Sequence, residues 1–202
     1  THMKSLVEAQ KRHARDLSSL RIGIFGAGTN SAVPIMREGL EVLKPFRPIT
    51  AYGMTEIGGN ACLSFMDSND EQICETSGRP CDGFDFRVID PDTGQEQPFD
   101  VSGEIVLKSY NVMTCYYKKP EETAKAYNAD GGFLTGDMGY MRADGFLRFL
   151  GRYKDMLKIG GENVDPMEVE AYLQGHPDVA ETAVIGHPDE RLMEVAIAFN
   201  AP

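Results

Sequence analysis

The sequence predicts an α/β fold in three parts: a strand–helix–strand (βαβ) unit, a β-rich subdomain, and the start of a second, small α/β domain. Three observations support this prediction. An apolar run at 21–26 is followed by glycines, a helical stretch and a second strand. Residues 82–110 alternate between apolar and polar side chains. A helical segment and two further apolar runs follow residue 151.

The first element is an amphipathic helix over 4–19, because apolar side chains recur close to one helical face. Residues 1–3 resemble the scar of a cleaved purification tag. We therefore leave them out of the predicted fold.

The strand–helix–strand unit follows. Residues 21–26 have the pattern of a short buried strand, and residues 32–43 that of a helix. Pro45 ends the helix because proline cannot continue the hydrogen-bond ladder. The second strand is predicted at 49–52.

The β-rich part begins with alternating strands at 84–89 and 104–107, separated by a turn sequence at 90–94. A short helix at 120–127 and a strand at 145–150 complete it.

The last part starts with a helix over 166–174 that carries proline in its first turn. Apolar runs at 179–185 and 194–199 predict two strands after it. These elements predict the beginning of a small α/β domain.

Composition limits the partners. The net charge of −11 repels phosphate backbones, so nucleic acid is not an expected partner. No apolar run approaches the roughly 20 residues of a membrane helix, and we expect a soluble, cytoplasmic protein without a transmembrane segment. The cysteines lack metal-ligand spacing, and we interpret them as reduced packing residues. They are Cys62, Cys74, Cys81 and Cys115.

A glycine cluster at 26–31 lies between the first strand and its helix, where backbone N–H groups can meet a phosphate or a base edge. A tight turn that requires small residues explains the cluster equally well. The cluster departs from the dinucleotide-binding fingerprint, because Ser31 follows where that pattern needs glycine or alanine.

The second strand ends in Tyr52-Gly53-Met54-Thr55-Glu56. The aromatic ring can stack on a purine, the glycine frees the turn, the threonine can donate to a phosphate oxygen, and the glutamate can bind Mg²⁺. Alone, a strand end with a polar turn explains the motif. Asp137 adds a carboxylate for the vicinal ribose hydroxyls, and Arg152 adds a charge for the same nucleotide. Together these residues indicate one nucleotide site.

Four motifs carry a resemblance. They are Tyr-Gly-Met-Thr-Glu at 52–56, Gly-Glu-Ile-Val at 103–106, Thr-Gly-Asp at 135–137, and Gly-Arg-Tyr-Lys-Asp-Met-Leu-Lys-Ile-Gly-Gly-Glu-Asn-Val at 151–164. The chain resembles the AMP-dependent acyl-CoA synthetases, or fatty-acid CoA ligases, of the adenylate-forming superfamily. Cys115 and Met193 stand where these enzymes usually have glycine.

The resemblance implies an acid–thiol ligase that uses ATP, Mg²⁺ and CoA. A carboxylic acid, most simply a fatty acid, reacts with MgATP to give acyl-AMP, and the thiol of CoA then displaces AMP. The implied roles for the first step are adenine binding, α-phosphate binding, Mg²⁺ binding and ribose binding. Ala27 and Gly28 would line the adenine pocket, and Tyr52 would pack on adenine beside Gly53, which also belongs to the nucleotide site. Thr55 would bind the α-phosphate, and Glu56 would bind Mg²⁺. Asp137 and Arg152 would bind the ribose.

The resemblance also implies a second catalytic face. Lys154 falls at the hinge about which the small domain rotates between the two half-reactions. Lys158, Gly160 and Gly161 would belong to the thioester-forming face, where a pantetheine arm needs backbone without side chains close by.

The resemblance divides the chain into the back part of the large AMP-binding domain over 4–150, with its α/β portion at 4–60 and its β-rich portion at 75–150. The hinge and the first part of the small domain follow at 151–202. The family's phosphate loop and its carboxy-terminal lysine motif are not in the sequence. We therefore expect a fragment that is inactive alone.

Other functions remain open at this stage. One is a noncatalytic nucleotide-binding module, and another is an adenylation domain that loads the thiol of a carrier protein. A third is a dinucleotide oxidoreductase, although the acid expected about 20 residues beyond its fingerprint is missing. The acyl chain length and the oligomeric state are left open.

Overall fold

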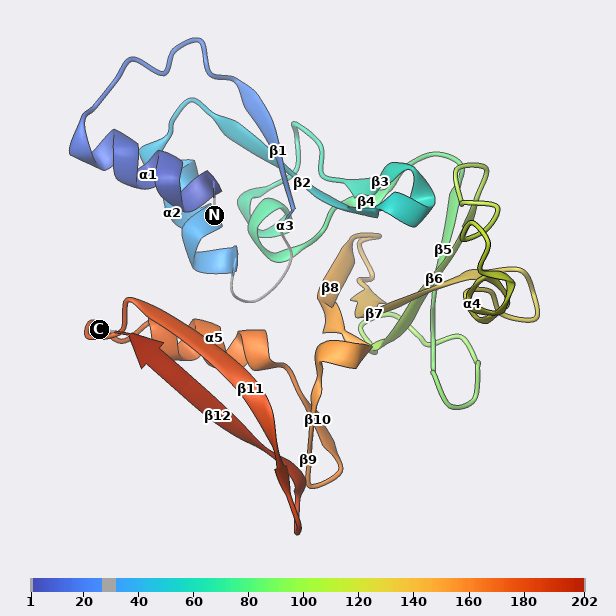
Figure 1. The fold of residues 1–202 in the computed structure, drawn as a ribbon. Coiled ribbons are helices and arrows are strands. Elements are labelled where there is room, and N and C mark those ends of the chain that lie inside the picture. The colour runs from blue at the N-terminus through green and yellow to red at the C-terminus, as the bar shows by residue number, and fades with distance from the viewer. Residues whose placement is uncertain (1, 27–31, 202) are drawn as a thin grey trace.

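A computed structural model describes residues 2–26 and 32–201, which contain three four-stranded sheets. The sheets follow one another along the chain, with short helices beside them (Figure 1). The predicted α/β fold class is confirmed.

Sheet A contains the predicted strand–helix–strand unit, in the strand order β1-β2-β3-β4. Its strands are β1 (Ile22–Gly26), β2 (Arg47–Met54), β3 (Gly59–Leu63) and β4 (Arg79–Pro80). The helices beside it are α1 (His2–Arg12), α2 (Val33–Val42) and α3 (Asp70–Glu75). β1 and β2 run parallel, and α2 lies between them in the chain, so the unit is confirmed. β3, β4 and α3 were not predicted.

The first helix differs from its prediction at both ends. α1 begins at His2 and ends at Arg12, and its buried residues, Met3 and Val7, lie one turn apart on one face. Met3 is 2% exposed and packs against Gly39, where an added Cβ would lie 2.7 Å from the methionine sulfur. Leaving residue 3 out of the predicted fold was therefore wrong.

β1 is an edge strand and not the buried strand that its sequence predicts. Phe25 packs edge-on against Phe46 on the face covered by α1 and α2. On the other face, Ile22 and Ile24 are 43% and 58% exposed. The apolar run alone could not show that only one face of this strand is covered among the described residues.

Sheet B is antiparallel and has the order β5-β6-β7-β8. It consists of β5 (Phe84–Ile89), β6 (Gly103–Ser109), β7 (Phe133–Met141) and β8 (Leu147–Arg152), with α4 (Pro120–Lys125) between β6 and β7. The predictions of β5, β6, β8 and α4 are confirmed. β7 was missed, because its Thr-Gly-Asp centre interrupts the alternation of a regular strand.

Sheets A and B share a core. Tyr52 and Cys62 of sheet A pack with Ile105 and Leu147 of sheet B. A neighbouring cluster joins the short 3₁₀ helix η2 (Thr55–Ile57) and β3 to β6 and β7. The two sheets therefore fix one another's position.

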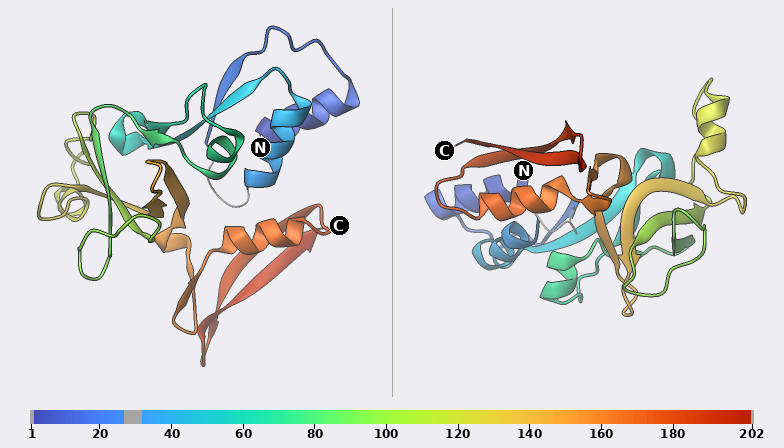
Figure 2. Two further views of the ribbon diagram at one scale, coloured as in Figure 1. Left: turned by 180° about the vertical axis from the view of Figure 1, so that it is seen from behind. Right: turned by 90° about the horizontal axis from the view of Figure 1, so that it is seen from below.

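Sheet C has the order β10-β9-β12-β11. It consists of β9 (Leu157–Ile159), β10 (Glu162–Val164), β11 (Glu181–Asp189) and β12 (Met193–Ala201), with α5 (Pro166–Gln174) beside it. The 3₁₀ helix η3 (Tyr153–Asp155) leads into it from β8, and both views of Figure 2 show sheet C with α5 set apart from sheet B. The predictions of α5, β11 and β12 are confirmed. The domain division at residue 151 stays a prediction.

The structure bears on two further features of the sequence, the state of the cysteines and the presence of a membrane-spanning helix. The four cysteines are free thiols, as expected, and Cys62 and Cys74 are buried. Cys115 is exposed and is not a packing residue, which corrects the prediction. Among residues 2–26 and 32–201, no helix combines the length and the apolar character that a membrane crossing requires.

Met193 begins β12 with a left-handed backbone, at φ 68°. β11 and β12 pair Asp189 with Met193, so residues 190–192 close the hairpin. A left-handed backbone favours glycine, because glycine has no Cβ to clash. This geometry explains why glycine is usual here in the family that the sequence resembles.

We expect Met193→Gly to raise the free energy of unfolding by about 0.5–1 kcal/mol. Glycine removes the steric cost of the left-handed backbone, about 1–2 kcal/mol, which stabilises the folded protein. Its greater conformational entropy in the unfolded chain offsets about 0.5–1 kcal/mol of this gain. Urea denaturation measures the change, with Met193→Ala as a control that retains the Cβ. Equal stability of the two variants would contradict the prediction.

Candidate functional site

A pocket of about 200 Å³ lies where the carboxyl ends of β1 and β2 meet sheet B. Ligands of open α/β sheets bind at this edge of parallel strands. The pocket is lined by Gly26, Ala51, Tyr52, Gly53, Asp137, Phe149 and Arg152. Four of the predicted site residues, from both sheets, therefore meet in one place.

Gly53 is required by close packing and not by a turn, which corrects the sequence interpretation. A Cβ at this position would lie 1.9 Å from the carbonyl oxygen of Gly59. β2 and β3 shift register between Tyr52 and Gly53. The glycine allows this close approach at the pocket edge.

The Thr135-Gly136-Asp137 motif is a kink within β7. Gly136 has φ 70°, a left-handed conformation that favours glycine. Thr135 Oγ1 donates to the Ile105 carbonyl oxygen at 2.7 Å and accepts from Asp137 N–H at 3.1 Å. Gly136 N–H donates to Glu104 Oε1 at 3.0 Å. These hydrogen bonds fix the backbone that carries Asp137.

The Asp137 carboxylate joins three strands. Its side chain is 4% exposed. Its Oδ2 accepts a hydrogen bond of 2.7 Å from the Tyr52 hydroxyl on β2. Arg152, its cross-strand partner on β8, places Nε 3.2 Å from Oδ1.

The Arg152 contact is an ion pair without hydrogen-bond geometry. Oδ1 of Asp137 is therefore a buried acceptor without a hydrogen-bond partner among the described residues. A buried polar atom of this kind costs free energy unless a ligand or water satisfies it. The unpartnered oxygen belongs to a residue that lines the pocket.

Burial raises the pKa of Asp137, and the Tyr52 hydrogen bond and the Arg152 charge offset that effect only in part. Glu56 and Asp155 raise the pKa further by repulsion. Burial, followed by the charge of Asp137, also raises the pKa of the Tyr52 phenol far above its ordinary value. Tyr52 is therefore a neutral donor at every physiological pH.

The Tyr52 ring is itself largely enclosed. It is 7% exposed, and its centroid lies 5.9 Å from that of Phe149 and 6.2 Å from that of Phe86. The small exposed part lines the pocket. Adenine packing by Tyr52 stays a prediction, while its contact with Asp137 was not predicted.

Thr55 and Glu56 lie just beyond the pocket in η2, where Thr55 is exposed and Glu56 is half-buried. Glu56 Oε1 accepts a hydrogen bond of 3.0 Å from the Tyr116 hydroxyl. Burial and this hydrogen bond raise the pKa of Tyr116, which keeps the phenol protonated.

The carboxylate of Glu56 suits a magnesium ion that also binds phosphate. Within the described ranges, no group of three or more His, Cys, Asp or Glu is placed to hold a metal ion. Mg²⁺ bound with a nucleotide needs only one or two carboxylates, because phosphates and waters supply the other ligands. Glu56 fits this role.

The residues predicted for the second face lie outside the pocket. Lys154 is exposed in η3, the link between sheets B and C. Lys158 is exposed on β9, and its ammonium group donates to Asn163 Oδ1 on β10. Neither lysine lines the pocket at Asp137.

Gly160 and Gly161 close the β9–β10 hairpin, with φ values of 62° and 94°. Two-residue hairpin loops with two positive φ values favour glycine at both positions. The hairpin alone therefore explains both glycines. A Cβ at Gly161 would meet nothing within 4 Å, so the backbone at Gly161 is open to an approaching ligand.

Ala27 and Gly28, the predicted adenine-binding residues, lie outside the described residues. The adjacent Gly26 lines the pocket. Sequence reasoning missed Phe149, Glu104 and Tyr116. Only Glu104 lies in a quoted motif, and its pairing with Gly136 could not be seen from spacing.

The comparisons with known proteins identify the family. The profile of the AMP-binding enzyme family matches residues 1–117, and that of the AMP-binding enzyme C-terminal domain matches residues 168–202. The chain belongs to the AMP-binding enzyme family. The alternative of a dinucleotide oxidoreductase was therefore wrong.

Relatives and solved structures agree with this family. The chain is 39% identical over 188 residues to the putative acyl-CoA synthetase YngI of Bacillus subtilis, covering 92% of this chain and 34% of that protein. It is 38% identical over 189 residues to the fatty acid–[acyl-carrier-protein] ligase ScoC of Streptomyces coeruleorubidus, covering 92% and 36%. The chain thus spans about a third of the length of the curated relatives it matches.

Among solved structures, the chain resembles o-succinylbenzoate CoA synthetase (MenE) from Bacillus subtilis in complex with its acyl-adenylate intermediate. The TM-score is 0.82 and the identity 30%, over 98% of this chain and 39% of that chain. The likeness extends across all three sheets, because it covers nearly the whole chain.

We expect Tyr52→Phe to lower the free energy of unfolding by about 2 kcal/mol at pH 7, because it removes a hydrogen bond to a buried carboxylate. Urea denaturation measures the loss. Tyr172→Phe, at a side chain that is 84% exposed, is the control for loss of a hydroxyl. A similar loss in both variants would refute a special role for Tyr52.

We expect Asp137→Asn to gain stability relative to the parent protein as pH rises from about 4 to 7. The folded-state pKa of Asp137 is raised, so the parent protein binds this proton more tightly when folded and loses that contribution as pH rises. The difference in unfolding free energy, measured by urea denaturation at several pH values, should therefore increase with pH. A flat or falling difference would mean that burial does not raise this pKa.

Proposed function

We propose that this chain is the nucleotide-holding part of an acid–thiol ligase that activates a carboxylic acid, in particular a fatty acid, as acyl-AMP and transfers the acyl group to CoA. The observation that carries the proposal is the buried Asp137 Oδ1, which has no hydrogen-bond partner among the described residues and belongs to a pocket at the sheet edge. Family membership supports the chemistry. The activity belongs to enzymes about three times as long.

Asp137 and Arg152 would recognise the ribose. A buried carboxylate oxygen accepts hydrogen bonds from neutral hydroxyls, and two vicinal hydroxyls can approach one carboxylate together. Arg152 remains 47% exposed on its side chain, so its guanidinium can contact a ligand while Nε stays near Oδ1. The similarity to MenE, whose solved structure holds an acyl-adenylate, supports a nucleotide site in this chain.

Tyr52, Gly53, Ala27 and Gly28 would border the adenine. The pocket already includes Tyr52 and Gly53 from β2. Because Gly53 has no side chain, the strand backbone lies open to a flat base. The carboxyl ends of β1 and β2 therefore suit the purine side of the nucleotide.

Thr55 and Glu56 would bind the phosphate side. Thr55 is exposed at the start of η2 and would donate its hydroxyl to the α-phosphate. Mg²⁺ held with Glu56 would neutralise phosphate charge as the acid attacks the α-phosphorus. The chain's own contribution is to hold the phosphates beside the ribose contact.

Lys154, Lys158, Gly160 and Gly161 would serve the second half-reaction. η3 is the short segment between β8 and β9, and a hinge needs few residues. Rotation about Lys154 would bring Lys158 and the open backbone at Gly161 toward the acyl-adenylate. The positive φ values of the glycines have their own structural cause, so this role rests on the family resemblance.

Two alternatives share the same nucleotide site. A carrier-protein thiol could replace CoA, and the similarity to ScoC, a fatty acid–[acyl-carrier-protein] ligase by name, favours this alternative specifically. A noncatalytic module would bind nucleotide without turnover. The cytoplasmic location stays a prediction.

We expect the chain to bind AMP more tightly than 2′-deoxy-AMP or 3′-deoxy-AMP, by about 5–30-fold. Loss of a hydrogen bond to a charged group costs about 1–2 kcal/mol. Asp137→Asn should lose most of this discrimination. Isothermal titration calorimetry with the three nucleotides measures it.

The matched control for this experiment is Asp178→Asn, because Asp178 is a carboxylate whose side chain is 89% exposed. It should retain the preference for ribose. Equal binding of AMP and its deoxy analogues by the parent protein would contradict ribose recognition by Asp137. Absence of AMP binding would contradict a nucleotide site in this chain.

A further inference from the structure

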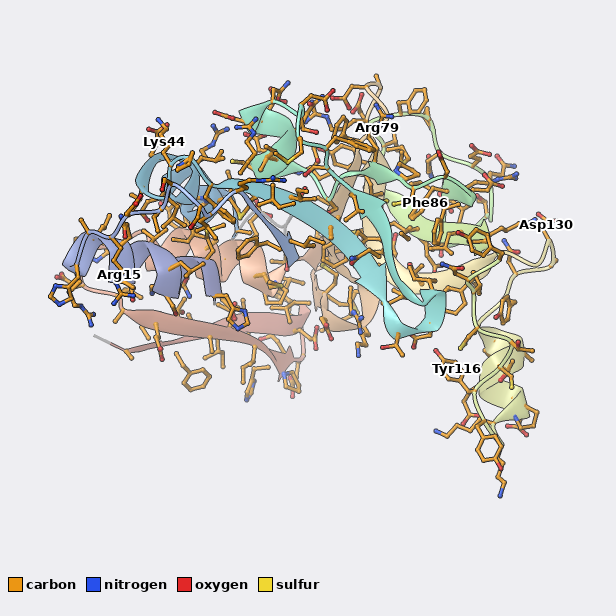
Figure 3. The ribbon with its side chains drawn as sticks, turned by 90° about the horizontal axis from the view of Figure 1, so that it is seen from above. Arg15, Lys44, Arg79, Phe86, Tyr116 and Asp130 are labelled. Atoms are coloured by element: carbon orange, nitrogen blue, oxygen red, sulfur yellow. The ribbon has the colours of Figure 1, made fainter. Side chains whose placement is uncertain are left out.

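The segment between β6 and β7 projects from sheet B as an arm that carries α4, and Tyr116 lies on this arm (Figure 3). α4 has no buried residues. Its first turn carries Glu121 and Glu122, and its last turn carries Lys125. Burial of α4 therefore contributes little to holding the arm, and the contacts at its base decide where it stands.

Those contacts converge on η2, the turn that carries Glu56. Met113 N–H donates to the Glu56 carbonyl oxygen at 2.7 Å. The Tyr127 hydroxyl donates to the Met113 carbonyl oxygen, and its ring packs edge-on against Phe133 at 5.7 Å between centroids. The start of the arm is thus bonded to Glu56 in η2, and the end of the arm is bonded to its start.

The arm also fixes the backbone of Tyr116. Tyr116 N–H donates to Thr123 Oγ1 at 3.0 Å, and that hydroxyl donates to the Lys119 carbonyl oxygen at 2.7 Å. Lys119 N–H donates back to the Tyr116 carbonyl oxygen at 3.0 Å. With its backbone held in this way, the phenol reaches the Glu56 carboxylate, 60 residues away in sequence.

The hydrogen bond divides the Glu56 carboxylate into two different oxygens. Oε1 accepts from Tyr116 at 3.0 Å. Among the hydrogen bonds and ion pairs of the described residues, Oε2 has no partner. A half-buried glutamate otherwise has several rotamers, and a fixed donor on one oxygen selects among them.

We propose that Tyr116 is a positioning residue that orients Glu56 and presents its Oε2 to Mg²⁺ bound with the nucleotide phosphates. This inference rests on the proposed function. Residues that hydrogen-bond to a metal ligand fix its orientation, and their removal weakens metal binding by about 10–100-fold. The arm thus acts on the Glu56 carboxylate through the Tyr116 hydroxyl.

The test compares ATP affinity in excess Mg²⁺ with ATP affinity in EDTA, measured by isothermal titration calorimetry without an acid substrate. Tyr116→Phe should lower the affinity in Mg²⁺ by about tenfold and leave the affinities for ATP in EDTA and for AMP within about twofold. Glu56→Gln provides the reference for complete loss of the Mg²⁺ effect. A purely structural role would lower all three affinities together.

Tyr117→Phe is the matched control, because Tyr117 is the adjacent tyrosine and is 82% exposed. It should behave as the parent protein. An unchanged Mg²⁺ effect in Tyr116→Phe, or an equal loss of ATP and AMP affinity, would overturn the inference. If Glu56→Gln also matches the parent, Glu56 does not bind the metal and the inference is wrong, while ribose recognition at Asp137 is tested separately by the deoxy analogues.

Discussion

The hydrogen bond between the Tyr52 hydroxyl and Asp137 is the contact on which the site depends. It joins sheet A to sheet B across 85 residues of sequence, and its 2.7 Å length is that of a strong bond to a carboxylate. Cys62, Ile105 and Leu147 surround it with apolar packing. In these apolar surroundings the Asp137 carboxylate would cost much free energy without the Tyr52 hydrogen bond. The relative placement of the two sheets is therefore fixed by this polar contact as well as by apolar packing.

This contact requires backbone adjustments on both strands. β2 shifts register after Tyr52, where only glycine can approach β3 so closely. β7 bends at Gly136, whose left-handed conformation aims the next side chain inward, and Glu104 holds that bend. Both motifs therefore owe their glycines to backbone geometry. The buried acceptor that remains, Oδ1 of Asp137, lowers the stability of the protein unless a ligand or water satisfies it.

Sequence reasoning was accurate where the signal is local. Proline in the first turn correctly predicted α5, and the two apolar runs after it correctly predicted β11 and β12. It failed where a strand departs from regular alternation, as in β7, or where burial depends on distant elements, as in β1. The motifs correctly brought Tyr52, Asp137 and Arg152 to one pocket. The contacts made by Tyr52 and Tyr116 join residues 60 or more positions apart, and no spacing rule in a single sequence reveals such pairs.

The two carboxylates of the site differ in the ligands they suit. Asp137 is buried beside one neutral donor and one guanidinium, with its pKa raised, so it suits the neutral hydroxyls of a sugar that enters without water. Glu56 is half-buried at a strand end, where a cation can keep part of its hydration shell. Mg²⁺ gives up its bound waters reluctantly, and the buried position of Asp137 would require it to lose them. The site at Asp137 is therefore less suitable for Mg²⁺ than the site at Glu56. Each carboxylate accepts a hydrogen bond from its own tyrosine hydroxyl on one oxygen, Asp137 from Tyr52 and Glu56 from Tyr116. The second oxygen of each carboxylate is left for a ligand. The same arrangement would serve the proposed sugar recognition at one end of the nucleotide and the proposed metal binding at the other.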